Sequence, residues 1–275
     1  MAKVYGIDLG TTYSVISTLD DNGMPEVIAN QDEGSDLLAS AVYFQNGADP
    51  VVGEVAKNQK DIEPERVVEF VKRYIGKPNA PTYEFDGVKY DPITISSLIL
   101  KRMKAYADAQ GHDVKNVVIT CPAYFGNEEK AATRQAGIIA GLNVLNIVHE
   151  PTAAALNYCV REFKENRKIM VYDLGGGTFD ITLFDFSVDD SGKALIDVIK
   201  TGGNDRLGGI DWDARMFDYM CQKYAFENGT EVSNMDDELR TTIRAQVEQA
   251  KKDLSTLEKK SYTIKYDGDR TRIEL

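Results

Sequence analysis

Two segments of the sequence combine an acidic side chain with a turn of small residues, a pattern that suits phosphate binding. Asp8 stands in VYGIDLGTT and Asp173 stands in VYDLGGGTF. Each aspartate follows an apolar run and precedes Leu-Gly, so its carboxylate lies beside backbone N–H groups that glycine leaves accessible. Such a turn can hold a phosphate, and the carboxylate suits Mg2+, which is usually bound by one or two acids together with substrate phosphates.

The two segments form an internal repeat. The aligned positions are Asp8 with Asp173, Gly10 with Gly175, and Thr12-Tyr13-Ser14 with Thr178-Phe179-Asp180 after one extra glycine. One copy alone would equally suit a tight structural hairpin. Two copies about 165 residues apart indicate duplicated halves that face one another. We therefore predict two opposed phosphate loops, with both aspartates directed at a shared nucleotide site.

Helical patterns separate and follow these predicted hairpins. We expect helices at 64–75, 93–110, 127–140 with Asn127 as its cap, 211–226 and 236–259, and a short buried strand at 117–120. Strands alternate with helices in both halves, which predicts an α/β fold with mixed sheets that begin in hairpins. We expect a first lobe at 1–165 and a second lobe at 166–275. No Pro- or Ser-rich linker separates them, so we expect the lobes to share an interface.

Composition excludes several classes of protein. The 275 residues carry a net charge of −12, which disfavours nucleic-acid binding through a basic face. No apolar run predicts a membrane span, and no secretory signal is expected at the N-terminus. Three scattered cysteines and two isolated histidines predict neither a disulfide framework nor a zinc site. These observations predict a cytoplasmic enzyme or binding protein.

Other common catalytic and nucleotide-binding motifs are absent from the sequence. It contains no G-x-x-x-x-G-K-[ST] phosphate loop and no G-x-G-x-x-G that opens a helix after a strand. It also lacks the nucleophile elbow expected for Ser-His-Asp catalysis. The repeated Asp-Leu-Gly hairpins are therefore the main chemical signal.

Further segments extend this signal into a family resemblance. In chain order they are VYGIDLGTTYSV, VKRYIG, VVITCPAYFGNEEKAATRQAG, HEPTAAAL, VYDLGGGTFDITL, GGNDRLGGIDWD and VEQAKKDLST. Together they resemble the ATPase domain of the 70-kDa heat-shock protein (Hsp70, DnaK-like) chaperones. The twin hairpins alone would indicate only the superfamily that includes actin and sugar kinases. The resemblance implies duplicated ribonuclease-H-like lobes, that is, an actin-like ATPase fold.

The resemblance also implies roles at the phosphate side of a nucleotide site. Asp8, Glu150 and Asp173 match acids that surround Mg2+ largely through its waters. Lys72 matches the lysine that orients the attacking water and meets the γ-phosphate, and Asp173 or Asp180 is the candidate general base. Thr178 is a candidate donor to the γ-phosphate. The residues that match the phosphate loops are Gly10, Thr11, Thr12 and Tyr13 in the first, and Gly175, Gly176, Gly177 and Thr178 in the second.

Glycines and one helix match the adenosine side of the family's site. The matching positions are Gly208, Gly209, Glu248, Lys251, Lys252 and Ser255. From its spacing alone, the polar stripe formed by the last four would indicate a solvated helix face. Two departures occur: the family usually has Arg at Lys252, where lysine stacks less well on adenine, and an acid at Ile210. Pro122 resembles a proline that switches the domain between nucleotide states.

The family resemblance predicts an ATPase that uses ATP/ADP and Mg2+, with K+ as a further candidate. Its implied partners are a J-domain co-chaperone, a nucleotide-exchange factor and unfolded client proteins bound by a further C-terminal domain. The alternatives are a sugar or small-molecule kinase of the actin-like superfamily, a non-catalytic nucleotide-binding fragment, and an actin-like filament. Because the sequence stops after a predicted hairpin at SYTIKYDGDRTRIEL, we expect a second lobe that is incomplete at its C-terminal end.

Overall fold

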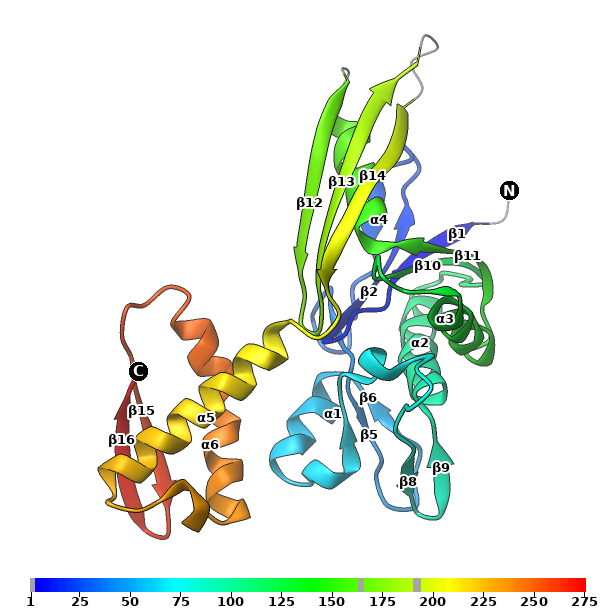
Figure 1. Cartoon of the computed structure of the whole chain (residues 1–275). Coiled ribbons are helices and arrows are strands. Elements are labelled where there is room, and N and C mark those ends of the chain that lie inside the picture. The colour runs from blue at the N-terminus through cyan, green and yellow to red at the C-terminus, as the bar shows by residue number, and fades with distance from the viewer. Residues whose placement is uncertain (1–2, 163–165, 190–193) are drawn as a thin grey trace. The chain divides into compact units, whose positions relative to one another are not determined.

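The computed structural model describes residues 3–162, 166–189 and 194–275 (Figure 1). Contacts divide the chain into two compact units, Met1–Leu207 and Gly208–Leu275. Each unit is described by itself below. The lobe boundary expected at 165/166 follows the internal repeat instead of these contacts, and it stays a prediction. Part of the segment around that boundary lies outside the described residues.

A mixed sheet organises the beginning of the first unit, with strand order β11-β10-β1-β2-β3 and with β4 paired to β2. The strands are β1 (Val4–Asp8), β2 (Tyr13–Leu19), β3 (Pro25–Val27), β4 (Leu38–Ala39), β10 (Asn116–Cys121) and β11 (Asn143–His149). β1 runs parallel to β10 and antiparallel to β2, which confirms the first predicted hairpin and the mixed sheet. Alternate residues such as Ile7, Ile16 and Ile119 are buried in the core. The carboxyl ends of β1 and β10 lie side by side, so their last polar side chains share one edge of the sheet.

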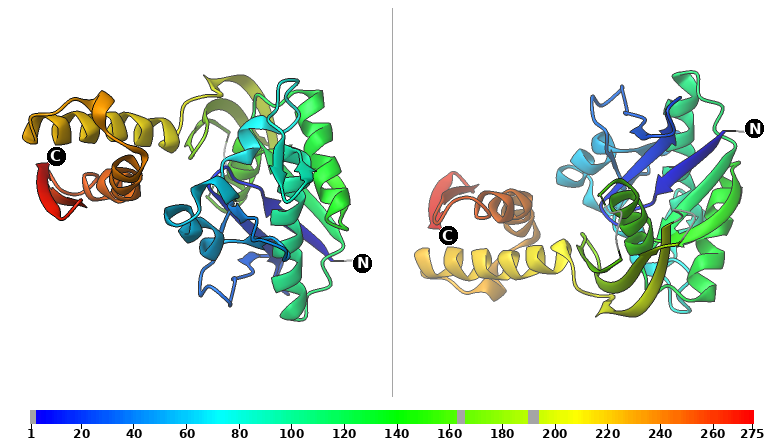
Figure 2. Two further views of the ribbon diagram at one scale, coloured as in Figure 1. Left: turned by 90° about the horizontal axis from the view of Figure 1, so that it is seen from below. Right: turned by 90° about the horizontal axis from the view of Figure 1, so that it is seen from above.

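Two helices match their predicted ranges closely, α2 (Pro92–Ala109) and α3 (Asn127–Ile139). They contact each other, and α3 also contacts β10 and β11 (Figures 1 and 2). The Asp91 side chain accepts the Thr94 N–H at 2.7 Å and so caps α2. The expected Asn127 cap of α3 is wrong. The N-cap is Gly126, whose N–H donates to Glu129 at 2.9 Å, so Asn127 is already the first helical residue.

The prediction of a helix at 64–75 is also wrong, because this segment forms three short elements in succession. It forms η2 (Pro64–Arg66), β7 (Val67–Val68) and η3 (Val71–Tyr74). The β-branched pair Val67–Val68 joins β5 (Val42–Tyr43) in an antiparallel ladder, so these two residues are in a strand and not in a helix. Phe70 then has φ 57°, a left-handed conformation that a helix cannot continue through.

The second predicted hairpin is present as a three-stranded antiparallel sheet. It comprises β12 (Arg167–Leu174), β13 (Phe179–Val188) and β14 (Ala194–Asn204). Helix α4 (Glu150–Glu162) contacts β12 and β13. Ala155 and Cys159 of this helix pack with Phe184 and Phe186 of β13 in a small core of their own. The order of strand, Asp-Leu-Gly turn and antiparallel strand in β12–β13 therefore matches that in β1–β2.

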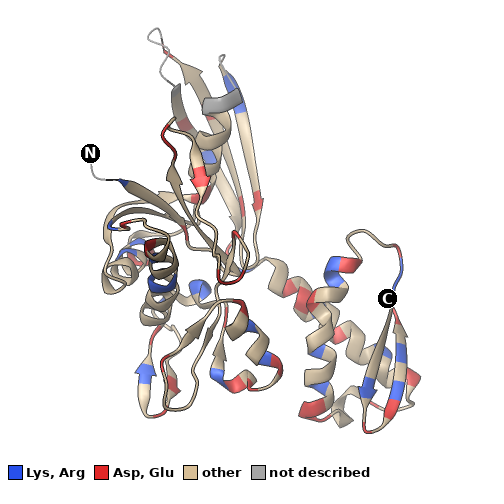
Figure 3. Cartoon of the chain, turned by 180° about the vertical axis from the view of Figure 1, so that it is seen from behind, with Lys and Arg blue, Asp and Glu red and all other residues tan. Residues whose placement is uncertain are grey.

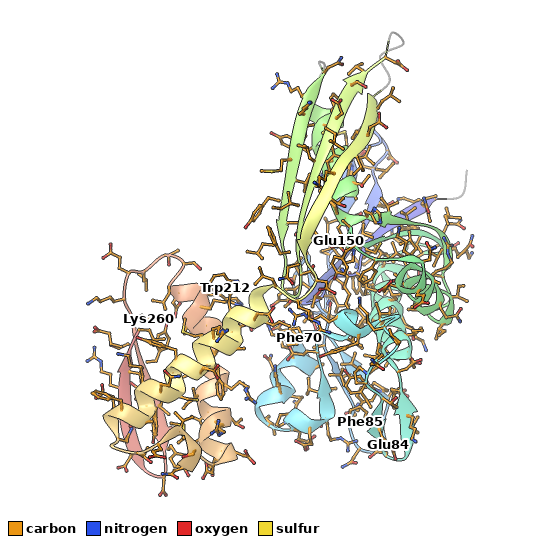
Figure 4. All side chains as sticks on the ribbon, viewed as in Figure 1. Phe70, Glu84, Phe85, Glu150, Trp212 and Lys260 are labelled. Carbon is orange, nitrogen blue, oxygen red and sulfur yellow. The ribbon has the colours of Figure 1, made fainter. Side chains whose placement is uncertain are left out.

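Shorter elements complete the first unit. They are β5 (Val42–Tyr43), β6 (Val51–Val52), α1 (Glu54–Asn58), η1 (Gln59–Asp61), β8 (Tyr83–Phe85) and β9 (Val88–Tyr90). The aromatic rings of Phe44 and Phe85 stack with centroids 4.1 Å apart, and the Tyr90 ring centroid lies 4.6 Å from that of Phe44. This contact joins the β8–β9 hairpin to the main core (Phe85 is labelled in Figure 4).

The second unit has its own core. It contains α5 (Gly209–Glu227), η4 (Val232–Asn234), α6 (Asp237–Asp253), β15 (Ser261–Tyr266) and β16 (Asp269–Glu274). Buried side chains from both helices and both strands pack together, among them Met220, Ile243, Ile264 and Ile273. The final hairpin is confirmed, with Asp267 and Gly268 at positive φ in its two-residue turn.

The helix expected at 236–259 ends early, at Asp253. After it the chain turns, and Leu257, which lies within the expected helix range, is 47% exposed. The Asp253 carboxylate accepts hydrogen bonds from Lys260 at 2.5 Å and from the Tyr262 hydroxyl at 2.8 Å. These contacts draw the chain into β15, which explains why the apolar spacing beyond Asp253 does not continue as helix.

Charged side chains of both signs are interspersed over each unit (Figure 3). In the part of the chain that the structure describes, no helix is long and apolar enough to cross a membrane.

Candidate nucleotide site

Both Asp-Leu-Gly hairpins line one cavity of about 450 Å³ in the first unit. The lining residues are Asp8, Gly10, Thr11, Thr12, Tyr13, Lys72, Thr120, Glu150, Ala153, Ala154, Asp173, Gly175, Gly176 and Thr178. This set contains most of the residues predicted for the phosphate side. Both turns therefore line the same cavity, and its use as a nucleotide site stays a prediction.

The two glycine turns approach each other closely. A Cβ built on Gly176 would overlap the Thr12 hydroxyl, and one on Gly177 would come 2.6 Å from Thr11 Cγ2. The turns are also held internally, since the Gly175 N–H donates to the Thr178 carbonyl at 2.9 Å and the Gly10 N–H to Ser14 Oγ at 3.1 Å. A side chain at 176 or 177 would therefore require Thr12 or Thr11 to move.

A buried ion pair lies on the cavity wall. Lys72 Nζ donates to Glu150 Oε1 at 2.5 Å, and both side chains are largely shielded from solvent (Glu150 is labelled in Figure 4). Burial opposes the charge on Lys72, but the Glu150 and Asp8 carboxylates outweigh it and raise the pKa of the ammonium. Burial raises the pKa of Glu150 to about 7, although Lys72 works in the opposite direction. An ammonium group is thus fixed among carboxyl groups on the cavity wall.

Two further carboxyl groups near the cavity, those of Asp173 and Asp180, have raised pKa values. Burial and the Asp8 charge raise the pKa of Asp173, and burial and the Asp173 charge raise the pKa of Asp180 to about 6. Asp173 and Asp180 are register partners across β12 and β13. Asp173 lines the cavity, whereas Asp180 is 2% exposed and is absent from the lining. Asp8 Oδ1 accepts the Thr120 hydroxyl at 2.6 Å, which fixes its orientation.

These acids can hold a hydrated cation. Among the described residues, no three His, Cys, Asp or Glu side chains are grouped closely enough to ligate a metal ion directly. Asp8, Glu150 and Asp173 nevertheless share the cavity. Burial raises the pKa of Glu150 and of Asp173, and the Asp8 charge raises both further. A carboxylate set of this kind fits Mg2+, which keeps several of its waters.

The residues predicted for the adenosine side belong to the second unit and do not line this cavity. Gly208 is the N-cap of α5, and Gly209 is its first residue. Lys251 Nζ pairs with Asp213 at 2.7 Å and donates to the Gly209 carbonyl at 3.2 Å. Lys252 pairs with Glu248 at 2.8 Å. The Ser255 hydroxyl donates to the Lys251 carbonyl at 3.2 Å. The side chains of the polar stripe therefore form ion pairs and hydrogen bonds with residues of the second unit.

Sequence reasoning missed four residues at the site. Thr120, Ala153 and Ala154 line the cavity, and Arg73 donates to the carbonyl of Gly177 in the second turn. Thr120 was recognisable, because it follows an apolar run at the carboxyl end of a strand parallel to β1, where ligands of α/β sheets usually bind. Arg73 carried no such signal, because the segment around it was expected to be a regular helix.

A cavity lined by two Asp-Leu-Gly turns and by a buried lysine among carboxyl groups has the features expected of a nucleotide-binding protein. Comparison with known proteins identifies the family. The family model described as "Hsp70 protein" matches residues 4–84 and 79–271. The chain is 43% identical over 254 residues to the chaperone protein DnaK of Thermotoga neapolitana, and equally so to that of Thermotoga maritima. The alignment covers 92% of this chain and 41% of each relative.

The chain belongs to the Hsp70 family. It spans about two fifths of the length of the curated relatives that it matches.

Proposed function

We propose that this chain binds ATP and ADP with Mg2+ and hydrolyses ATP as the nucleotide-binding domain of an Hsp70-type chaperone. The observation that carries the proposal is the single cavity lined by both Asp-Leu-Gly turns and by the Lys72–Glu150 pair. Family membership supports the same reaction. The duplicated actin-like arrangement of lobes, divided at 165/166, is part of this proposal.

In this proposal the backbone N–H groups and threonine hydroxyls of the two turns bind the phosphates, with Thr178 at the γ-phosphate. Asp8, Glu150 and Asp173 would hold Mg2+ through its waters, and the ion would offset phosphate charge when bound. Lys72 orients the attacking water and stabilises the charge that develops on the transferred phosphoryl group. Because Asp173 lines the cavity and Asp180 does not, we assign proton acceptance from the water to Asp173. Asp180, the register partner of Asp173 across β12 and β13, would then act only as a neighbouring carboxyl group and would take no proton from the water.

The finer assignments rest on the resemblance. Gly208, Gly209, Glu248, Lys251, Lys252 and Ser255 would contact adenosine. Pro122 would switch the domain between nucleotide states, and K+ is a further candidate ion. A J-domain co-chaperone, a nucleotide-exchange factor and unfolded clients are the proposed partners of the complete protein, in the cytoplasm.

The direct test replaces Lys72 with alanine. We expect Lys72→Ala to abolish phosphate release while ATP binding remains measurable by isothermal titration, because lysine acts mainly on the transition state. Lys77→Ala is the matched control, since Lys77 pairs with Glu129 at 3.0 Å outside the cavity lining. Unchanged turnover in Lys72→Ala would overturn the assigned role. Binding without turnover in the unaltered chain would favour a non-catalytic nucleotide-binding module.

A further inference from the structure

Arg73, next to Lys72, holds the second glycine turn by a forked contact. Its Nε and Nη2 atoms both donate to the carbonyl oxygen of Gly177, at 3.0 Å and 2.7 Å. The two residues are 104 positions apart in sequence, so this contact joins η3 to the turn between β12 and β13. Hydrogen bonds from a charged donor are stronger than neutral ones, and a planar guanidinium fixes direction as well as distance.

Gly177 sits in a narrow space between Arg73 and the first turn. A Cβ built on it would lie 3.1 Å from Arg73 Nε and 2.6 Å from Thr11 Cγ2. The Gly175 N–H to Thr178 carbonyl bond closes the same turn. A turn with three consecutive glycines has little intrinsic rigidity, so its position depends on contacts of this kind.

The element that carries Arg73 also carries Lys72. η3 is a 3-10 helix, in which successive side chains point about 120° apart, so neighbouring residues can serve two different partners. Lys72 reaches Glu150, and Arg73 reaches Gly177. The left-handed backbone at Phe70 starts this helix, and strained conformations of that kind are kept where the surroundings fix them (Phe70 is labelled in Figure 4).

We propose that Arg73 is a positioning residue that sets the distance between the second phosphate turn and the Lys72 ammonium. The inference rests on the proposed function, because it assumes that this turn holds phosphate. Phosphate bound by this turn would then lie at a defined distance from the Lys72 ammonium, because η3 carries both Lys72 and Arg73. Reaction rates respond steeply to such placement, and an error of about 1 Å can cost on the order of a hundredfold.

The test is the conservative variant Arg73→Lys. Lysine keeps the charge but lacks the planar fork, so it cannot reproduce the two-donor contact with Gly177. The matched control is Arg134→Lys, because Arg134 of α3 also donates to a backbone carbonyl, that of Val144, outside the cavity lining. Two kinds of measurement are made on the whole chain: amide hydrogen exchange of the 175–178 turn without nucleotide, and kcat and KM for Mg·ATP.

We expect Arg73→Lys to speed exchange of the Gly175 amide and to lower kcat, each by roughly tenfold, while KM changes by less than about twofold. Arg134→Lys should change none of these three quantities. Unchanged exchange in Arg73→Lys overturns the inference, and so does faster exchange with unchanged kcat, because the contact would then be structural only. If the unaltered chain hydrolyses no ATP, the proposed function fails, and the exchange measurement alone decides whether Arg73 holds the turn.

Discussion

At the scale of single residues, one buried carboxyl next to the cavity-lining Asp173 costs stability. Asp180 is 2% exposed, and its Oδ2 atom has no hydrogen-bond partner among the described residues. Burial raises the pKa of this carboxyl from 3.8 to about 6. A buried acid with a raised pKa destabilises the folded state wherever it must be ionised. Such a cost is typical of groups retained for function.

Replacing this acid by its neutral isostere should therefore stabilise the chain in a pH-dependent way. The cost of ionising Asp180 begins near pH 3.8, the unfolded value, and is complete above about pH 6, the folded value. We expect Asp180→Asn to raise the free energy of unfolding by roughly 1–3 kcal/mol at pH 8 and by less at pH 5. Urea denaturation in EDTA at the two pH values measures it. A gain that is equal at both pH values, or a loss at pH 8, would contradict the assigned burial cost.

At the scale of elements, the two glycine turns that line the cavity approach each other closely. Gly176 lies against Thr12, whereas a Cβ added to Gly202 of β14 would have no atom within 4 Å. The same substitution at these two glycines therefore separates the effect of a methyl group in the site from its effect on a strand. Neither glycine has a positive φ, so backbone strain does not confuse the comparison.

We expect Gly176→Ala to displace the turns and to weaken Mg·ATP binding by about tenfold or more, since the added methyl overlaps the Thr12 hydroxyl. Gly202→Ala should leave the affinity within about twofold of the unaltered chain. Isothermal titration of both variants measures this difference. Equal affinities in the two variants would show that the close approach of the turns does not matter for binding.

The elements also show what the sequence could predict. The hairpins, α2, α3 and the two Asp-Leu-Gly turns followed from short-range spacing, because each pattern is complete within one element. Lys72, Glu150 and Asp180 were named by the family resemblance and not by spacing. The 64–75 segment did not follow from spacing, since its conformation depends on pairing with β5 and on the left-handed backbone at Phe70. Arg73 was missed for the same reason. The end of α6 was set by the contacts of Asp253 with β15, which no helical period reveals.

At the scale of the whole molecule, the main core of each unit is built from that unit's own residues. The core of Gly208–Leu275 includes Ile243, which is fully buried, and that of the first unit includes Ile7 and Ile119. The only tryptophan, Trp212, lies in the second unit and is 58% exposed (labelled in Figure 4). Its fluorescence therefore reports on one unit alone.

We expect Ile243→Ala to destabilise the second unit by roughly 2–5 kcal/mol, the usual cost of truncating a buried isoleucine to alanine. The midpoint of unfolding followed by Trp212 fluorescence should fall, while a second transition followed by circular dichroism keeps its midpoint. Ile62→Ala, at a position 72% exposed in the first unit, is the control and should move neither. A single transition that shifts as a whole would show that the two cores unfold together.

We have proposed that carboxylates of both hairpins and their glycine turns form one Mg2+-dependent ATP site, and the Mg2+ dependence of ATP affinity is its sharpest test. Affinity is measured by titration with Mg2+ and with EDTA, in the unaltered chain, in Asp8→Asn and in the exposed control Asp21→Asn. We expect Mg2+ to strengthen binding by about tenfold or more in the unaltered chain and in Asp21→Asn, and Asp8→Asn to lose most of this gain. An ATP affinity that does not respond to Mg2+, or a full response in Asp8→Asn, would contradict the proposed site.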